Sequence, residues 1–516
     1  MREVRQDLAK FVFLAVVIQI PFELRQTVFG LSNLQWTFVL LVLLTSPDLL
    51  ANWKHLLSDR LARAAAIFIG VEWLAAIYAP EFHTNAVKAA TRLTAGLLLI
   101  VISKRLSDTT SGYVSKHVLT TWTIVSAGAA AYALSDYAGF GFPRLFRTEE
   151  FYIGQTLRLS GSFEYPNTAA AYFAMSLPIV WWSSFRTILR TVFVFALWCA
   201  VILTFSKGAL LALPAVALIA RRRAAVPMLA TGLVAYAALV PLAPYLIDRF
   251  YGPVARNPIG VEYNAEWNYL QQSPHATEIL PLEIHNIGIS TLRSRGQRRS
   301  AVSYRWWNVQ TEKFFDASPL VTALPADVRP GETVRVDAAF QTPDEPGEYL
   351  LVFELFTRNF DWFSRMTIVP FLVQADIHPH ASRTTGWTDL SSIYKRGQDA
   401  TTLSAAVPRS SLWKAALKMF IDHPFGVGPD NYRLQYGNYL GVKRWDTHVH
   451  SNNLYLEILT GGGILGLAAF GFMIAQRRWG DDPTSLGAAV FLVHGIVDVF
   501  LMTTPIYFAF WILMAL

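Results

Sequence analysis

The sequence predicts a mainly α-helical, polytopic membrane bundle with a large extracytoplasmic insertion that contains an all-β, sandwich-like domain. Three observations lead to this fold class. Of the 516 residues, 53% are hydrophobic and only 16% are charged, whereas soluble chains carry about 25% charged residues. Apolar runs recur along residues 1–250 and 453–516. The segment between them is polar and contains short strand-like runs.

The apolar runs predict about 12 membrane spans. A spanning helix needs about 20 mostly apolar residues, and the last of these segments is short. The predicted spans are residues 8–28, 31–50, 61–79, 86–103, 117–138, 167–184, 188–205, 207–220, 225–247, 454–475, 484–503 and 505–516.

Basic residues fall in alternate connections between these spans, which predicts the orientation of the chain. Because Lys and Arg gather on the cytoplasmic side of membrane proteins, the N-terminus is expected in the cytoplasm and residues 248–453 outside it. The net charge of +7 is then a sign of topology, and we expect no nucleic-acid partner. The clusters are Arg2, Arg5, Lys10; Lys54, Arg60; Lys104, Arg105, Lys116; Arg186, Arg190; Arg221, Arg222, Arg223; and Arg477, Arg478.

Residues 257–377 are expected to form the β-domain. Runs such as "GEYLLVFELF" and "ETVRVDAAF" alternate or are β-branched, and turn signals such as "RPGE" and "TPDEPGE" separate them. About seven strands of this length are typical of a small β-sandwich. The aromatic stretches "SYRWWN" and "NFDWF" are interpreted as core residues or as a surface that stacks on sugars, and both readings stay open.

Residues 378–452 follow as an extracytoplasmic loop with catalytic residues. Within it, "RSSLWKAALKMFIDHPFGVGPDNY" predicts a short amphipathic helix and then a Gly/Pro loop. Leu412, Leu417 and Phe420 are expected to face either the membrane or the helical bundle.

Several charged side chains and histidines gather at the predicted outer face. Lys207 and Arg409 suit an anion such as phosphate, although a snorkelling lysine and an ordinary surface arginine are equally simple readings. His450 is a candidate base because its ordinary pKa of about 6.5 leaves it largely neutral at pH 7. It is alternatively a core or capping histidine. His448 and His450 could instead ligate a metal, with Asp446 alongside, but a third or fourth ligand at a convincing spacing is lacking, and the single Cys199 excludes a cysteine-based site. Glu457 is a candidate for orienting a partner or for lining a polar cavity.

Four stretches resemble the O-antigen ligase and O-antigen polymerase superfamily of polytopic glycosyltransferases. They are "GSFEYPNTAAAYFAMSLP" (161–178), "FSKGALLAL" (205–213), "RSSLWKAALKMFIDHPFGVGPDNY" (409–432) and "HVHSNNLYLEILTGGGILGL" (448–467). All four occur in order and on one predicted membrane face, whereas residues 257–377 lie outside the usual core of the family.

The resemblance implies an enzyme of the bacterial inner membrane that uses no cofactor or metal. It would move a glycan from a polyprenyl-diphosphate carrier to a hydroxyl of a lipid, glycan or protein acceptor, with inversion at the anomeric carbon. Arg409 would hold the diphosphate, Lys207 stands where the family mostly has Arg, and His450 would take the acceptor proton, with His448 as the alternative base. Further substrate contacts are implied for Asn167, Glu164, Asn452, Asn453, Trp413 and Asp430.

Ligase and polymerase activities are not separated by the sequence. A lipid-glycan transporter is the alternative outside the enzyme class. Transporters of this kind place charges near the bilayer midplane and contain internal repeats, whereas here the charges gather at one mouth and no repeat is evident.

Overall fold

The chain divides into two compact units, which are described separately. The structure, a computed structural model, describes residues 2–56, 58–108, 113–140, 145–146, 151–153, 156–219, 225–242, 246, 260–288, 291–295, 299–311, 313–315, 319–357, 361–366, 368–390, 409–441, 447–501 and 503–516. The helical unit comprises Met1–Glu150, Arg158–Ala243 and Pro408–Leu516, and the β unit comprises Phe151–Leu157 and Pro244–Val407.

A helix lies in each of the twelve segments that the sequence marks as apolar. Four of these helices, at Asn33–Ala51, His83–Asp108, Ser115–Tyr137 and Leu454–Gln476, are long and apolar enough to cross a membrane. The full count of twelve spans stays a prediction. The helices are α1 (Arg2–Gln19), α2 (Asn33–Ala51), α4 (Arg60–Ile77), α5 (His83–Asp108), α6 (Tyr113–Tyr137), α7 (Pro166–Trp181), α8 (Thr187–Leu203), α9 (Lys207–Ile219), α10 (Ala225–Leu239), α15 (Leu454–Gln476), α16 (Pro483–His494) and α17 (Thr504–Ala515).

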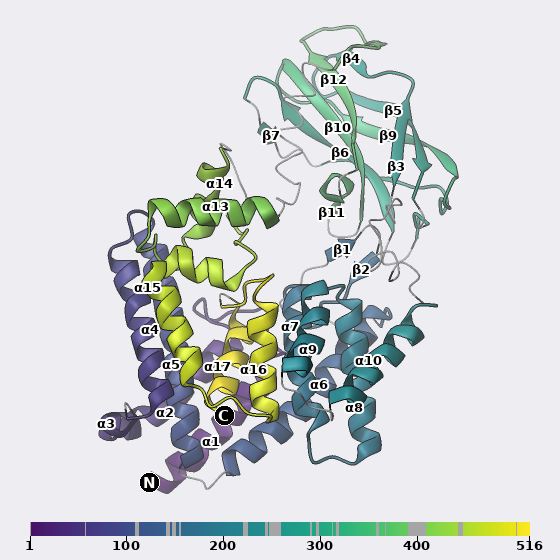
Figure 1. Cartoon of the computed structure of the whole chain (residues 1–516). Helices are drawn as coiled ribbons and strands as arrows, with labels where there is room; N and C mark the ends of the chain where they lie inside the picture. Colours follow the sequence, from purple (N-terminus) through teal and green to yellow (C-terminus); the bar gives the residue numbers. More distant parts are fainter. Residues whose placement is uncertain are drawn as a thin grey trace. The chain divides into compact units, whose positions relative to one another are not determined.

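Caps and apolar faces explain where these helices begin and what they bury. Asp482 accepts hydrogen bonds from the backbone N–H groups of Thr484 and Ser485 at the start of α16, and Pro483 fills its first position. Helices α7 and α17 are buried along almost their whole length. They therefore form the centre of the helical unit (Figure 1).

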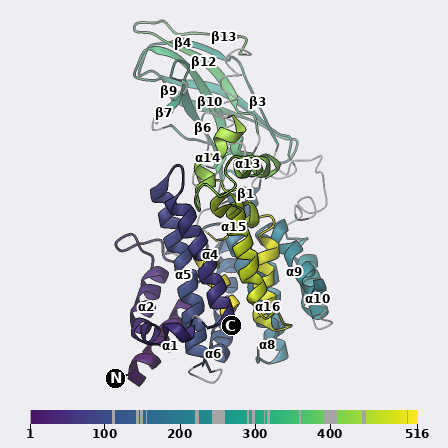
Figure 2. The same cartoon turned by 60° about the vertical axis from the view of Figure 1, so that its left-hand side comes forward.

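Three short helices complete the helical unit. They are α3 (Trp53–Leu56), α13 (Arg409–Asp422) and α14 (Tyr432–Leu440). The predicted amphipathic helix is thus present as α13, which packs against α14 and α15. Figures 1 and 2 show α13 and α14 at one end of the unit, beyond α4, α5 and α15.

The opposite end of the helical unit carries several of the predicted cytoplasmic charges. Arg105 pairs with Asp48 at 2.6 Å and Lys104 with Asp59 at 2.9 Å. Arg477 donates to the backbone carbonyl of Leu513 at 2.6 Å. These basic residues lie at one end, as the predicted topology requires, whereas Arg221–Arg223 lie outside the described residues. The orientation in the membrane stays a prediction.

Helix α15 is interrupted at Gly463, whose φ of 66° and ψ of −163° are not helical. The loop after α13 fills the break. The N–H of Val427 donates to the carbonyl of Thr460 (2.9 Å), the N–H of Gly428 to that of Gly461 (3.0 Å), and the N–H of Ile464 to that of Pro424 (3.0 Å). The triple glycine 461–463 is therefore needed for more than close helix packing: it lets another backbone bond to a spanning helix.

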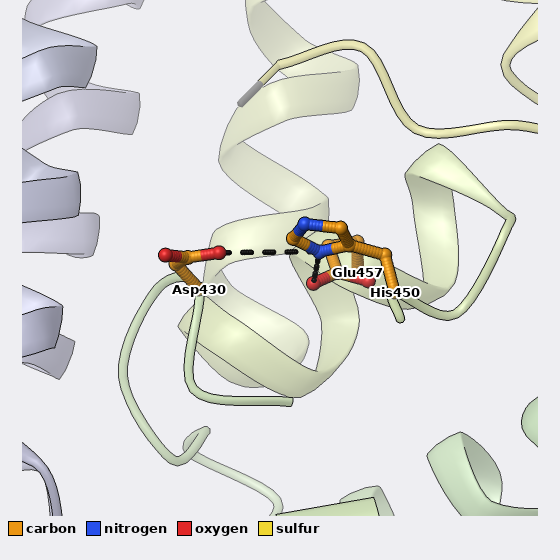
Figure 3. A group of neighbouring side chains, drawn as sticks. All are labelled: Asp430, His450 and Glu457. Atoms are coloured by element: carbon orange, nitrogen blue, oxygen red, sulfur yellow. Dashed lines mark hydrogen bonds and ion pairs between the residues drawn. The ribbon is translucent and has the colours of Figure 1, made fainter. Parts of the chain in front are cut away.

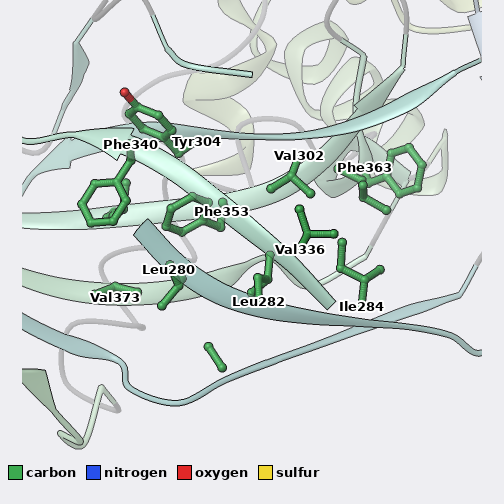
Figure 4. Packing of buried hydrophobic residues seen from close by; sticks show 14 of the residues in the cluster. Leu280, Leu282, Ile284, Val302, Tyr304, Val336, Phe340, Phe353, Phe363 and Val373 are labelled. Atoms are coloured by element: carbon green, nitrogen blue, oxygen red, sulfur yellow. The ribbon is translucent and has the colours of Figure 1, made fainter. Parts of the chain in front are cut away.

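Two antiparallel-rich sheets form the β unit, with their inner faces sharing one core. The larger has the order β13-β4-β12-β10-β6-β7, with β11 paired to β10 and β8 to β6, and the smaller has the order β3-β5-β9. Leu280, Leu282 and Ile284 of the small sheet pack with Tyr304 and Phe353 of the large one (Figure 4). The predicted sandwich is present, with more strands than the seven expected.

Strands β1 (Phe151–Ile153) and β2 (Thr156–Arg158) form a separate two-stranded sheet. The strands of the two larger sheets have the following bounds. They are β3 (Val261–Ala265), β4 (Tyr269–Gln272), β5 (Thr277–Asn286), β6 (Ser300–Asn308), β7 (Lys313–Phe315), β8 (Thr322–Ala323), β9 (Thr333–Gln341), β10 (Gly347–Thr357), β11 (Asp361–Trp362), β12 (Phe371–Ile377) and β13 (Thr384–Gly386).

The aromatic residues of the predicted sugar-stacking stretches are part of the core. Trp306, Trp307 and Phe363 are buried, and Trp362 is 9% exposed. The Arg305 side chain lies 4.7 Å from the Trp362 ring and pairs with buried Glu354. Asn359 and Phe360 of "NFDWF" lie outside the described residues. Because these rings are buried, they belong to the core, and the alternative prediction of a sugar-stacking surface is wrong for them.

Gly426 tests the contact between the loop and α15. It has a φ of +92°, and a Cβ there would lie 2.2 Å from the carbonyl oxygen of Gly461. Gly426→Ala should therefore destabilise the protein by about 3 kcal/mol, through backbone strain and overlap. The measurement is the thermal midpoint in detergent. Gly471→Ala in α15 is the control, because a Cβ at Gly471 meets nothing within 4 Å. Equal midpoints for the two variants would contradict the contact.

Candidate functional site

The His450 ring, just before α15, contacts two carboxylates, one from the first turn of α15 and one from the loop after α13. Its Nδ1 lies 3.0 Å from Oε1 of Glu457 and 3.9 Å from Oδ1 of Asp430. Figure 3 shows both contacts meeting at the same ring nitrogen, with Asp430 and Glu457 approaching from different segments. The predicted orienting role of Glu457 thus has a geometric basis.

The partners of Glu457 determine which ring nitrogen of His450 carries the proton. Oε2 of Glu457 accepts hydrogen bonds from the backbone N–H of Ser451 (3.0 Å) and from its hydroxyl (2.7 Å). A carboxylate that receives these donors is an acceptor toward His450 as well. Nδ1 of His450 therefore donates to Glu457, which leaves Nε2 as the basic nitrogen of the neutral ring.

Asp430 lies in a turn and has a φ of 64°, and this turn places its carboxylate near the His450 ring. Arg433 binds both of its carboxylate oxygens, at 3.0 and 2.9 Å. Arg433 also donates to Asn85 of α5 (2.8 Å) and to the backbone carbonyl of Thr447 (2.9 Å). The arginine thus connects the loop after α13, the start of α5 and the segment that carries His450.

Opposing effects act on the pKa of His450. Burial lowers the pKa of the imidazole, whereas the charges of Glu457 and Asp430 and the hydrogen bond to Glu457 raise it, and the net pKa lies above the ordinary value for histidine. A larger share of the ring is protonated near neutral pH than in a free histidine. The base form becomes dominant only as the pH rises through this raised pKa.

A second polar centre surrounds residues 494–498, after α16. Asn167 donates from Nδ2 to Oδ2 of Asp498 (2.6 Å) and accepts at Oδ1 from Arg158 (2.7 Å). Arg158 donates in addition to the backbone carbonyl of Thr204 (2.8 Å). The predicted substrate residue Asn167 is therefore engaged by two protein side chains, Arg158 and Asp498, that the sequence reasoning did not select.

The two predicted cations lie at the same end of the helical unit. The charge of Arg409, at the start of α13, acts on both His494 and Asp498. Lys207 opens α9 and is exposed. The adjoining Gly208 packs so closely on His494 that a Cβ would lie 2.7 Å from its ring. Arg409 and the α9 start that carries Lys207 thus both border residues 494–498.

The backbone of α15 joins the two centres. The Asn453 side chain caps the helix by accepting from the N–H groups of Tyr455 and Leu456 at 3.0 Å, and it donates to the carbonyl of Ile496 at 2.8 Å. The N–H of Leu454 donates to the carbonyl of Gly495 at 2.7 Å. Asn453, predicted as a substrate contact, therefore has a structural role that holds the segment after His450 against residues 494–498.

The remaining predicted site residues differ in their surroundings. His448 is exposed, and Asn452 has a φ of 53°, in the left-handed region. Trp413 is half-buried, and its indole N–H has no hydrogen-bond partner among the described residues. Glu164 is half-buried just before α7.

One of the two residues that were missed, Asp498, has a signal in the sequence. Asp498 is an acid within the apolar run "FLVHGIVDVF", and an acid in a membrane segment is by default a functional candidate. Arg158 shortly precedes the "GSFEYPN" stretch. Its link to Asn167 depends on the turn between them and carries no signal in the spacing.

Asp430, His450 and Glu457 also form a group that could hold a metal ion, since one ligand atom from each lies within 4.8 Å of the others. Both carboxylates already bind protein donors, Asp430 to Arg433 and Glu457 to Ser451. The neighbouring guanidinium disfavours a second cation at the same oxygens. The arrangement fits a hydrogen-bonded imidazole better than a metal centre.

Glu457→Gln tests the electrostatic assignment. Loss of the carboxylate charge should lower the pKa of His450, because the charge and hydrogen bond of Glu457 raise it in the unchanged chain. The measurement is a pH titration of the His450 ring by NMR of histidine-labelled protein, with His450→Gln used to assign the signal. An unchanged His450 pKa would show that Glu457 does not control the ring.

Comparisons with known proteins cover different parts of the chain. No curated protein matches it. Among solved structures, the chain is similar to Pseudomonas fluorescens alkylpurine DNA glycosylase AlkC bound to DNA containing an abasic site analog, with 11% identity over 61% of this chain and 96% of that one. The TM-score of 0.16 is too low for this likeness to carry any argument.

Residues 351–471 match the family described as O-antigen ligase. The matched segment contains α13, Asp430, His450 and Glu457, whereas Asn167 and Lys207 lie outside it. The match supports an O-antigen ligase or polymerase type of function in a membrane protein of polysaccharide biosynthesis. The resemblance of this chain to the O-antigen ligase and polymerase superfamily is therefore confirmed by the segment that carries the His450 centre.

Proposed function

We propose that this protein is an inverting, metal-independent glycosyltransferase of the bacterial inner membrane. It moves a glycan from a polyprenyl-diphosphate carrier to an acceptor hydroxyl at the extracytoplasmic face. The observation that carries the proposal is the His450 ring: a carboxylate holds one nitrogen, and the other is available as a base. The family match over residues 351–471 supports the reaction class.

His450 is the proposed general base. With Nδ1–H donated to Glu457, the lone pair of Nε2 accepts the proton of the acceptor hydroxyl. Glu457 and Asp430 stabilise the imidazolium that forms, because both carboxylates lie within 4 Å of the ring. Their charges raise the pKa of His450, which makes the ring a stronger base once it is deprotonated.

Charge balance assigns roles to the cations. The acceptor oxygen forms a bond to the anomeric carbon, and the bond from that carbon to the phosphate oxygen breaks. The electron pair of the broken bond stays on the polyprenyl diphosphate. Arg409 and Lys207 would stabilise this leaving group, since both cations lie at the end of the helical unit where α15 begins. The step therefore balances: His450 gains the proton of the acceptor, and the diphosphate gains one negative charge.

Arg158 and Asp498 are proposed as positioning residues for this donor site. Arg158 ties Asn167 to the carbonyl of Thr204, three residues before Lys207. Asp498 holds the other end of the Asn167 amide. Together these contacts connect the start of α7 to the end of α8 and to the segment after α16, close in sequence to Lys207.

The activity assay should use purified full-length protein with a polyprenyl-diphosphate oligosaccharide and a lipid acceptor. His450→Ala should abolish transfer at unchanged expression and monodispersity, because the proposed base is lost, whereas His448→Ala should retain activity. Single attachment to the acceptor identifies a ligase, and a ladder of repeats identifies the polymerase alternative.

Two further arms of this assay test the mechanism. The rate of the unchanged protein should rise with pH through the raised pKa of His450, because only the neutral ring is a base. Addition of a chelator should leave the rate unchanged. Full activity of His450→Ala would remove the ring as base, and loss of activity on chelation would contradict a metal-independent reaction.

A further inference from the structure

Helix α13 has one side that the protein buries and one that it does not. Leu412, Ala415, Ala416 and Met419 are buried, and this side faces α14 and α15. The hydroxyl of Tyr432 donates to the carbonyl of Leu412 at 2.8 Å. The helix is therefore fixed in its rotation about its own axis, so the other side presents a defined surface.

The opposite side carries an apolar stripe. Leu417 and Ile421 are four residues apart, and Phe425 follows at the same spacing in the loop. Ile421 is 73% exposed and Phe425 72% exposed. Single exposed apolar residues are ordinary, but a row of them along one helix face marks an interaction surface.

The stripe continues onto a candidate membrane span. The carbonyl of Pro424 accepts from the N–H of Ile464, so Phe425 lies at the level of the break in α15. Ile464 and Leu465, just after the break, are exposed as well. In a membrane-spanning helix, exposed apolar residues of this kind face lipid.

The length of α15 indicates how deep in the membrane the apolar stripe lies. Residues 464–476 extend about 20 Å from the break to the end of the helix, where Arg477 and Arg478 are expected at the cytoplasmic boundary. The hydrocarbon core is about 30 Å thick. If the helix ends at one boundary, the level of Phe425 falls within the apolar layer, about 10 Å short of its opposite edge.

Charges beside the stripe match phosphate headgroups. Lys414 and Lys418 are exposed and four residues apart, next to Leu417 and Ile421. Asp422, also exposed, is the acid at the end of the helix. An apolar stripe flanked by lysines is the arrangement of helices that lie in the membrane interface.

We infer that α13 lies in the boundary between headgroups and acyl chains of the extracytoplasmic leaflet, with Leu417, Ile421 and Phe425 in the acyl region and Lys414 and Lys418 at the phosphates. The occupant of this surface is the phospholipid bilayer. The helix anchors the loop that carries Asp430 to the membrane surface. This inference does not depend on the proposed reaction.

Site-directed fluorescence tests the inference on the full chain. Cys199, the single cysteine, is replaced by Ala, and one cysteine is placed at Ile421 or Leu417 and labelled with an environment-sensitive nitrobenzoxadiazole probe. The protein is placed in nanodiscs of phosphatidylcholine and phosphatidylglycerol. Doxyl-labelled phosphatidylcholine should quench the probe at both positions at least about twofold more than at the control position, Asp422→Cys, which lies off the stripe.

The quenching pattern separates the possible occupants. Emission at Ile421 and Leu417 should also shift to shorter wavelength, and aqueous iodide should reach Asp422 better than either. Equal lipid quenching at all three positions overturns the inference. Protection of Ile421 from both lipid and iodide quenchers also overturns it, because that result means that a second copy or another protein covers the stripe.

Discussion

The interruption of α15 is the constraint on which the rest of the site depends. A continuous helix would satisfy its own carbonyls, but at residues 460–464 the loop after α13 provides and receives the missing hydrogen bonds. Glycines permit this approach: Gly463 takes a non-helical conformation, and the Cα of Pro429 lies where a Cβ on Gly461 would come within 3.1 Å. The loop is thereby fixed against the helix, and Asp430 is brought to the ring of His450.

The two polar centres are connected through the cap of α15. Asn453 begins the helix and at the same time binds the carbonyl of Ile496, so the His450 segment and residues 494–498 are held as neighbours. One centre contains the His450 imidazole, whose pKa is raised, and the other borders Arg409 and Lys207. A substrate with a diphosphate and a reacting sugar carbon needs both features at once. The fold brings the two centres together by packing helix ends against one another.

Much of the helical architecture could be predicted from the sequence, because apolar runs and their caps are local signals. Each predicted span contains a helix, and α13 lies in the stretch where the amphipathic pattern indicates a helix. The contact between His450 and Glu457 was also accessible, because the two residues lie seven positions apart at the start of α15. The approach of Asp430 was not, because it depends on a loop entering a broken helix.

Other features depended on tertiary structure in the same way. Asn453 was expected to contact substrate, but its amide caps α15 and binds the carbonyl of Ile496. The paired tryptophans at 306 and 307 were compatible with either a core or a sugar surface, and only burial decided the question. Arg158 and Asp498 meet through Asn167 across more than three hundred residues, so no pattern along the chain connects them.

The most direct test of the account is photolabelling with a polyprenyl-diphosphate oligosaccharide that carries a diazirine on its first isoprene unit. If the cations and the imidazole share one donor site, mass spectrometry should find label in the segments around Lys207 and Arg409 and near His450, and unlabelled donor should suppress it. Label confined to the β unit, or to the end of the helical unit that carries Lys104 and Arg477, would contradict the account.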